Sequence, residues 1–354
     1  MTNRENILSI IKRQGYEKID PYFDLCPPLA DVFASEESSE TRYQDYFKFS
    51  MENIWDVTLL EVNTEKFLKY YRIPLKEGTV IDIWGVGHEK GSESAMHMTK
   101  MLYPLENAQS VQDIENYPFP DFSAIDILKL RNIVNNIKNE DKLSVGNMGM
   151  TIWECSWYIR GMENLMMDMM SDDEMATSLL DKVTEIAIKR AENFANAGVD
   201  VLFLGDDIGM QKTIMMSEEF YIKWLKPRLK KVIDAAKKVN PEILIFYHSC
   251  GYVTPFIPHL IEVGVEVLNP VQPECMNFED IHSLYGQSLS FFGTIGTQTT
   301  FPFGSISDVK TEVSRNLRIA GEKGGLIVAP THMVEPEVPW ENVKAYIEAC
   351  KEFV

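Results

Sequence analysis

The sequence predicts an α/β protein, a single (β/α)8 TIM barrel with a mostly helical N-terminal extension. Short runs rich in β-branched residues alternate with longer amphipathic segments along most of the 354 residues. This alternation predicts parallel strands joined by helices, and the number of units favours closure of the sheet into a barrel. With 45% hydrophobic residues, the chain can bury the core of such a barrel as one domain.

Seven short apolar runs are predicted to be barrel strands, because each ends in glycine, proline or polar residues. They are Thr79–Trp84, Leu143–Met148, Asp200–Gly205, Ile243–His248, Val265–Leu268, Leu289–Gly293 and Gly325–Pro330. We place the eighth strand near Tyr22–Leu25, within a helical extension of residues 1–75. The barrel domain is then expected to cover residues 76–354.

Two long helices are predicted from residues that favour a helix start. Ser171 and Glu174 have the spacing of a capping box that begins a helix ending near Asn196. Ser217 begins a second helix, which is expected to end near Val239.

Charge and cysteine content limit the environment and the partners. The net charge of −19, with no basic stripe, repels phosphate backbones and excludes nucleic acid as a partner. No run approaches the roughly 18 apolar residues of a membrane span, and the first residues lack the apolar core of a signal peptide. The five cysteines are odd in number and scattered, which favours a reducing compartment and leaves thiolates for metal binding. We therefore expect a cytoplasmic protein with no membrane partner.

A candidate metal site lies at the end of the predicted strand Ile243–His248. In an extended chain residues i and i+2 point the same way, so His248 and Cys250 can reach one metal ion together. One imidazole and one thiolate suit zinc. Strand ends converge on a barrel, and His332, just after the last strand, is the expected third ligand. The alternative is a strand-end histidine that binds a carbonyl and a small buried cysteine.

Two carboxylates, Asp206 and Asp207, end another predicted strand and should face the barrel mouth as catalytic residues. One would orient a zinc-bound imidazole or supply a fourth ligand, and the other would hold substrate. The alternative is that they cap the following helix or bind loop amides.

Expected substrate contacts follow the strand Leu143–Met148. Met150, Trp157 and Tyr158 can form an adaptable apolar wall for a flat substrate, although core packing is the competing interpretation. Asn147, just before that turn, and Gln298, after the seventh strand, are the expected polar contacts.

Three motifs resemble the uroporphyrinogen decarboxylase superfamily: H-S-C-G from His248, G-T-I-G-T-Q over Gly293–Gln298, and A-P-T-H-M-V-E-P-E-V-P-W-E-N-V over Ala329–Val343. More narrowly, the chain from about Thr79 onward looks like the corrinoid-linked methyltransferase branch. There a His-x-Cys pair and a third ligand after the last strand hold zinc. In the coenzyme M methyltransferases of that branch the third ligand is a cysteine, whereas this sequence has His332 at the matching place.

The resemblance to the decarboxylase itself is incomplete. That enzyme carries an Arg-Gln-Ala-Gly-Arg loop whose arginines bind the carboxylates of the porphyrinogen, and this sequence has no such run. Without a cationic cluster, an acidic chain has no evident means of drawing in an octacarboxylate. Asp82 falls roughly where the family keeps its pyrrole-binding aspartate, so this resemblance makes Asp82 and the nearby Trp84 expected substrate contacts.

The resemblance implies a zinc-dependent methyltransferase that acts between a small methylated donor and a corrinoid carried by a partner protein. Zinc can activate a thiol acceptor or polarise the oxygen of a methyl ether. A His/Cys/His site carries less negative charge than His/Cys/Cys, which favours the second role, an O-demethylation of a donor such as a methoxylated aromatic. The alternatives are a corrinoid-to-thiol methyltransferase, a metal-free decarboxylase that uses Asp82, Asp206 and Asp207, and a non-catalytic corrinoid-binding scaffold.

Overall fold

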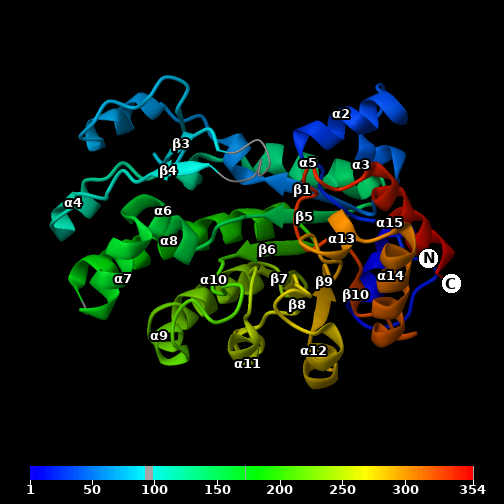
Figure 1. Cartoon of the computed structure of the whole chain (residues 1–354). Helices are drawn as coiled ribbons and strands as arrows, with labels where there is room; N and C mark the ends of the chain where they lie inside the picture. Colours follow the sequence, from blue (N-terminus) through cyan, green and yellow to red (C-terminus); the bar gives the residue numbers. More distant parts are fainter. Residues whose placement is uncertain (92–98, 172, 354) are drawn as a thin grey trace.

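The computed structural model describes residues 1–91, 99–171 and 173–353. Its centre is a curled parallel sheet in the order β1-β5-β6-β7-β8-β9-β10, surrounded by helices (Figure 1). The strands are β1 (Met51–Trp55), β5 (Leu143–Asn147), β6 (Val201–Gly205), β7 (Leu244–His248), β8 (Val267–Asn269), β9 (Ser290–Phe292) and β10 (Leu326–Ile327). Neighbours in the sheet are successive strand–helix units, so the fold is TIM-barrel-like.

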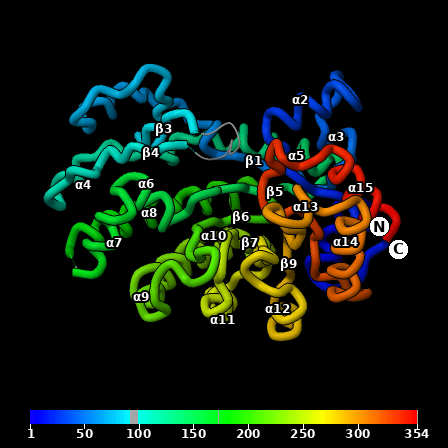
Figure 2. Tube along the Cα trace, in the orientation of Figure 1, coloured from blue at the N-terminus to red at the C-terminus, as the bar shows by residue number. Residues whose placement is uncertain are grey.

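The α-helices lie around the sheet in chain order, as the trace in Figure 2 shows. They are α1 (Asn3–Ile11), α2 (Pro27–Glu36), α3 (Tyr43–Tyr46), α4 (Val111–Glu115), α5 (Ile127–Asn139), α6 (Trp153–Arg160), α7 (Met162–Met170), α8 (Glu174–Ala197), α9 (Glu218–Trp224), α10 (Lys226–Val239), α11 (Ile257–Val263), α12 (Phe278–Tyr285), α13 (Thr300–Phe303), α14 (Ile306–Ala320) and α15 (Trp340–Glu352). Short 3-10 helices occupy Asp56–Leu59, Thr64–Tyr70, Phe122–Ala124 and Thr254–Phe256.

The expected barrel strand Thr79–Trp84 is wrong. Only Val80–Ile81 is extended, as β2, and it forms a separate antiparallel sheet with β3 (Gly87–Glu89) and β4 (Lys100–Leu102). The reason is local, because the Asp82 carboxylate accepts hydrogen bonds from the amides of Trp84 and Val86 at 2.8 and 2.9 Å. An aspartate that binds amides two and four residues ahead makes a turn and ends the strand.

The first strand of the main sheet comes instead from residues 51–55, inside the segment expected to be a helical extension. Strand β1 pairs with β5 over five residues, from Met51 with Leu143 to Trp55 with Asn147. Its sequence, M-E-N-I-W, lacks the continuous apolar run that is typical of buried parallel strands.

The segment predicted as an eighth strand, Tyr22–Leu25, lies beside the end of the sheet but is not a regular strand. Leu25 forms one isolated parallel bridge with Val334, supported by the hydrogen bond from the Val334 amide to the Asp24 carbonyl at 2.7 Å. The Tyr22 ring packs edge-on against Phe292 of β9, with 5.3 Å between centroids. An eight-stranded barrel is therefore not formed by the described strands.

The starts of the two predicted helices differ in detail from the expected ones. Helix α8 is capped by Asp173, whose side chain accepts from the Met175 amide, whereas Ser171 donates back to the Met167 carbonyl at the end of α7. Ser217 does cap α9, through the Phe220 amide. The second predicted helix is two helices, because Pro227 has no amide hydrogen to continue the hydrogen-bond ladder across Leu225.

A buried ion pair joins helix α8 to two loops at the mouth of the sheet. Arg190 and Asp56 are each at most 1% exposed, and two hydrogen bonds of 2.8 Å link them. The same guanidinium donates to the carbonyls of Met148 and Met150 at 2.6 and 3.1 Å. Because Asp56 directly follows Trp55, the pair fixes the end of β1 against the loop after β5.

Replacing Asp56 with alanine is expected to cost about 3–5 kcal/mol of unfolding free energy, because it leaves a buried guanidinium without its partner. Urea denaturation measures this loss. The control is Glu185→Ala, which breaks the exposed Lys182–Glu185 pair on the same helix and is expected to cost less than about 1 kcal/mol. Equal losses in the two variants would contradict the structural role of the buried pair.

Candidate functional site

A cavity of about 540 Å³ opens at the carboxyl ends of the parallel strands. In βα barrels this end of the sheet carries the active site. The walls are largely apolar and aromatic, with a few amide, carboxyl and imidazole groups. The lining residues are Tyr22, Phe23, Asp24, Leu25, Tyr43, Met51, Asn53, Trp55, Val145, Asn147, Gly149, Met150, Glu154, Phe203, Gly205, Phe246, His248, Asn269, Phe292, Pro330, Thr331, His332 and Met333.

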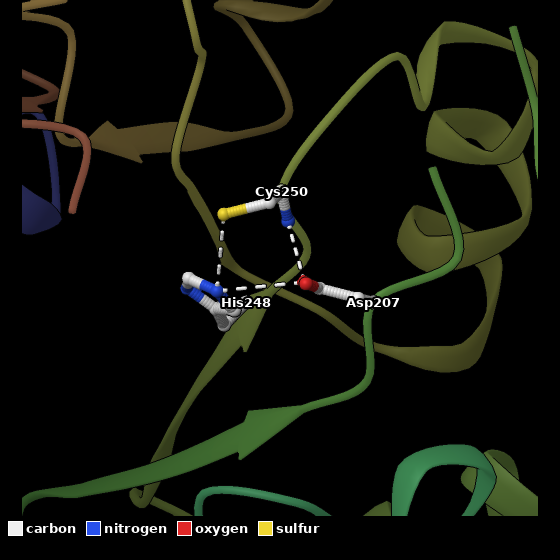
Figure 3. A group of neighbouring side chains, drawn as sticks. All are labelled: Asp207, His248 and Cys250. Carbon is white, nitrogen blue, oxygen red and sulfur yellow. Dashed lines mark hydrogen bonds and ion pairs between the residues drawn. The ribbon is translucent and has the colours of Figure 1, made fainter. Parts of the chain in front are cut away.

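At the end of β7, the side chains of His248, Cys250 and Asp207 point toward one another (Figure 3). His248 Nε2 lies 3.6 Å from Cys250 Sγ and 3.5 Å from Asp207 Oδ1. The Cys250 amide donates to the same Asp207 oxygen at 2.7 Å. One nitrogen, one sulfur and one carboxylate oxygen thus lie within 4.8 Å of one another.

These separations agree with a tetrahedral zinc site. Zinc bonds of about 2.0–2.1 Å to nitrogen, 2.3 Å to sulfur and 2.0–2.2 Å to oxygen place nitrogen and sulfur about 3.5 Å apart, and nitrogen and oxygen about 3.4 Å apart. The observed distances from His248 to Cys250 and Asp207 are 3.6 and 3.5 Å. The donor set also suits a borderline-soft ion. The two separations from His248 therefore agree with those of a tetrahedral zinc site, and the third pair of atoms lies within 4.8 Å.

Asn269, at the end of β8, fixes the tautomer of His248. Its Nδ2 donates to the Phe292 carbonyl at 2.8 Å, so its Oδ1 faces the imidazole. His248 Nδ1 then donates its hydrogen to that oxygen at 2.6 Å. The Nε2 lone pair is left pointing at Cys250 and Asp207, as a metal ligand requires. No motif marks Asn269 in the sequence, because its role depends on the pairing of β7 with β8.

Replacing Asn269 with leucine is expected to lower zinc affinity about 10- to 100-fold, the usual effect of losing an outer-shell partner of a metal ligand. Asn269→Asp keeps an acceptor for His248 Nδ1 and is expected to recover most of the affinity. Competition with a chromophoric chelator measures both. If the leucine variant bound zinc as tightly as the wild type, the orienting role of Asn269 would be wrong.

Close packing of two loops brings Asp207 to Cys250. A Cβ at Gly209 would lie 2.6 Å from the Cys250 carbonyl oxygen, and one at Gly251 would lie 2.8 Å from the Gly209 backbone. Gly251 also has a φ of +85°, which side-chain-bearing residues rarely adopt. These glycines let the loop after β6 contact the turn after β7.

His332 lies on the cavity wall near this group but not within it. The ring centroids of His332 and His248 are 6.5 Å apart. Two imidazoles on one tetrahedral zinc would have centroids about 5 Å apart. In this structure the side chain that lies with His248 and Cys250 is Asp207, and the expected ligand His332 lies farther away on the same cavity wall. Convergence of strand ends predicted the neighbourhood of His332 but not the orientation of its ring.

Asp206 does not have the geometry of a catalytic residue. Its carboxylate is 4% exposed and accepts hydrogen bonds from the amides of Ile152 and Glu154 at 2.9 and 2.8 Å. These amides belong to the start of helix α6, where a carboxylate satisfies unpaired donors. Asp206 therefore holds the β5–α6 loop in place, while the adjacent Asp207 points toward His248.

Glu154, on the cavity wall, lies between the aromatic residues of α6 and the group of His248, Cys250 and Asp207, hereafter the metal-ligand group. It accepts from the Tyr158 hydroxyl at 3.0 Å and from the Asp207 amide at 3.2 Å. Burial, and then the neighbouring Asp207 and Asp206 carboxylates, raise the pKa of Glu154 to about 8. Burial and the two neighbouring carboxylates thus disfavour the charged form of Glu154.

Of the expected substrate contacts near β5, Asn147 and Met150 line the cavity, whereas Trp157 and Tyr158 are not among its lining residues. Asn147 donates to Asn53 at 3.1 Å, which ties the polar ends of β5 and β1 together. Tyr158 reaches the cavity only through its hydrogen bond to Glu154, and the Trp157 ring packs edge-on against Tyr158, with 4.1 Å between centroids.

Asp82, Trp84 and Gln298 are not among the residues that line the cavity. Asp82 belongs to the turn of the small antiparallel sheet and contacts His88 Nε2 at 3.0 Å. Trp84 is buried against Phe122, and Gln298 is exposed. Their expected role depended on placing Thr79–Trp84 in the barrel, or on a loop conformation that the sequence does not specify.

Several cavity residues come from the first 75 residues and were missed. Asn53 and Trp55 belong to β1, and Trp55 remains 45% exposed at the mouth. Tyr22 and Asp24 come from the segment beside Val334. An unusually polar strand that ends in an exposed tryptophan was the available signal.

Within the described ranges, no helix combines the length and apolar character needed to cross a bilayer.

Known proteins similar to this chain are methyltransferases. A methylated-thiol–coenzyme M methyltransferase from Methanosarcina mazei is 26% identical over 201 residues, 55% of this chain and 49% of that protein. The methylcobamide:CoM methyltransferase MtaA from Methanosarcina barkeri is 28% identical over 174 residues, 49% of this chain and 48% of that protein. The chain thus matches about half the length of these curated relatives.

A solved structure supports the fold over the whole chain. A methyltransferase from Methanosarcina mazei superposes with a TM-score of 0.70 at 19% identity, covering 100% of this chain and 99% of the other. The family model for uroporphyrinogen decarboxylase (URO-D) matches residues 79–353, which include β5 to β10 and every residue of the metal-ligand group. The chain therefore belongs to the uroporphyrinogen decarboxylase (URO-D) family.

Proposed function

We propose that this protein is a zinc-dependent methyltransferase that moves a methyl group from a small methylated compound to a corrinoid carried by a partner protein. The observation that carries the proposal is the group of His248, Cys250 and Asp207, whose separations fit tetrahedral zinc at the mouth of the cavity. The activities named for the similar methyltransferases, two of which act on methylcobamide or methylated thiols, support it.

Each part of the site has a defined task in this reaction. His248, Cys250 and Asp207 would hold the zinc, and Asn269 keeps Nε2 of His248 available to it. When bound, zinc acts as a Lewis acid that polarises the heteroatom to which the methyl group is attached. Glu154 lies on the cavity wall beside Asp207, where its carboxyl group can contact the substrate. The aromatic walls exclude water from the reacting groups.

The two competing functions are decarboxylation of a porphyrinogen and methyl transfer from a corrinoid to a thiol. Decarboxylation of a porphyrinogen requires cations for its carboxylates, but no lysine or arginine of the described ranges lines the cavity. Methyl transfer to a thiol would use the same zinc ligands, and the names of the similar proteins favour it as the second candidate. The two methyl transfers differ in acceptor and direction.

Formation of methylcobalamin tests the proposal. Free cob(I)alamin is mixed with the zinc-loaded protein and a panel of methyl ethers and methyl thioethers, and visible absorbance follows the cobalt. The expected result is methylcobalamin formation that stops on zinc chelation and resumes on zinc return. Zinc-independent consumption of uroporphyrinogen, with no donor able to methylate the corrinoid, would replace the proposal with the decarboxylase alternative.

A further inference from the structure

The charge of the cavity is one-sided. Among the described residues, its wall carries the Asp24 and Glu154 carboxyl groups and no lysine or arginine. The nearby guanidinium of Arg190 is behind the wall and fully engaged by Asp56 and two backbone carbonyls. Apart from the zinc proposed at His248, a negatively charged ligand would therefore meet carboxyl groups and no lysine or arginine on this wall, in a chain whose net charge is already −19.

Asp24 is placed as a binding group rather than as a structural one. Its carboxylate is accessible from the cavity, and within the described part of the chain no donor or cation pairs with it; only its backbone carbonyl is engaged, by the Val334 amide. The residue is exposed, so a ligand that enters the cavity can contact it. A carboxylate that has no protein partner and faces a ligand cavity can form a charge-assisted hydrogen bond with an ammonium group of a ligand.

Aromatic rings on the same side of the cavity complement this carboxylate. Tyr22 and Tyr43 line the wall beside Asp24, and Trp55 lies at the mouth. The Tyr22 hydroxyl accepts from Asn53 Nδ2 at 2.6 Å, and the Tyr43 hydroxyl accepts from the Leu25 amide at 3.4 Å, so hydrogen bonds hold both rings. Ring faces attract ammonium groups, and tryptophan and tyrosine do so most strongly.

We propose that the cavity is selective for a small methylated compound that carries an ammonium group, which Asp24 and the aromatic wall bind while the methylated heteroatom faces His248. This inference rests on the proposed function and names its substrate class. Coenzyme M, which the names of the similar proteins include, is a sulfonate. The charge of the small molecule is therefore expected to differ between this chain and those proteins.

Binding of three matched compounds tests the inference without any corrinoid. 3-Methoxybenzylamine, 3-methoxybenzyl alcohol and 3-methoxybenzoate share the ring and the methyl ether and differ in charge. Isothermal titration calorimetry at neutral pH with zinc-loaded protein measures the three affinities. We expect 3-methoxybenzylamine to bind at least about tenfold more tightly than 3-methoxybenzyl alcohol, because its ammonium group adds a charge-assisted hydrogen bond and cation–π contacts. The benzoate should bind most weakly.

Variants separate the site from the general negative charge of the protein. Asp24→Asn should reduce ammonium affinity to that of the alcohol and leave alcohol affinity unchanged. Asp31→Asn removes the same charge from the exposed face of α2 and should leave the order of affinities as in the wild type. A circular dichroism melt confirms that each variant is folded.

Three results would overturn the inference: benzoate binding tighter than the alcohol, an ammonium preference that survives Asp24→Asn, or no binding of the ammonium at millimolar concentration. The outcome is separate from that of the proposed function. If the protein selects ammonium compounds but forms no methylcobalamin, the inferred binding site stands and the proposed methyl transfer is wrong. If it transfers methyl groups from an anionic donor alone, the proposed methyl transfer stands and the inferred ammonium site is wrong.

Discussion

Replacing Cys250 with alanine is expected to remove zinc from the protein and to reduce methyl transfer more than about 100-fold. Loss of an outer-shell partner alone costs about 10- to 100-fold in metal affinity or activity, and Cys250 is a direct donor. Burial raises the pKa of the Cys250 thiol, so the thiolate form depends on the metal. Elemental analysis after dialysis gives the zinc content, and the methylcobalamin assay gives the rate.

The control for this variant is Cys275→Ala. Cys275 follows β8 and its thiol contacts Gln211 at 3.4 Å, so it offers a second half-buried cysteine outside the metal-ligand group. This variant should keep its zinc and its rate. One zinc per chain in the Cys250 variant, or loss of zinc from the Cys275 variant alone, would show that the ligand set is wrong.

The second large effect is expected at Asp207. Asp207→Asn removes the negative charge of the third donor while keeping an oxygen for the Cys250 amide, and zinc affinity should fall more than about 100-fold because a first-shell ligand is weakened. His332→Ala should lower it less, since its ring lies outside the tetrahedral group. Chelator competition titrations compare the two variants directly.

A larger loss of zinc affinity in His332→Ala than in Asp207→Asn would identify a different third ligand. If His332→Ala lost zinc and Asp207→Asn kept it, the metal would be held by His248, Cys250 and His332, and the ring of His332 would have to turn toward His248. Equal losses would indicate that all four residues complete the coordination. Only a smaller loss for His332→Ala agrees with Asp207 as the third ligand.

Strands β7 and β1 differ in how clearly their sequence patterns predict them. The run that forms β7 is continuously apolar and ends in polar residues, so its position could be read from the pattern. Strand β1, M-E-N-I-W, mixes polar and apolar residues because its side chains line the cavity as well as the core. Thr79–Trp84 looked more like a strand, but the hydrogen bonds of Asp82 turn the chain there.

The sequence predicts the pair of His248 and Cys250, because backbone geometry alone determines that their side chains lie together. The i, i+2 relation at a strand end brings His248 beside Cys250, and the structure places them together. For Asp206 and Asp207 the sequence could not decide, because adjacent side chains diverge and their partners come from a distant loop. Asn269 was missed for the same reason, since its role depends on the pairing of β7 with β8.

X-ray absorption at the zinc K-edge can detect a zinc ion held by His248, Cys250 and Asp207. On the zinc-loaded wild type, the account predicts one sulfur at about 2.3 Å, with nitrogen and oxygen donors at about 2.0–2.2 Å completing four-coordination. The sulfur contribution should vanish in Cys250→Ala and persist in Cys275→Ala. A shell with two sulfurs, or with none in the wild type, would contradict the account.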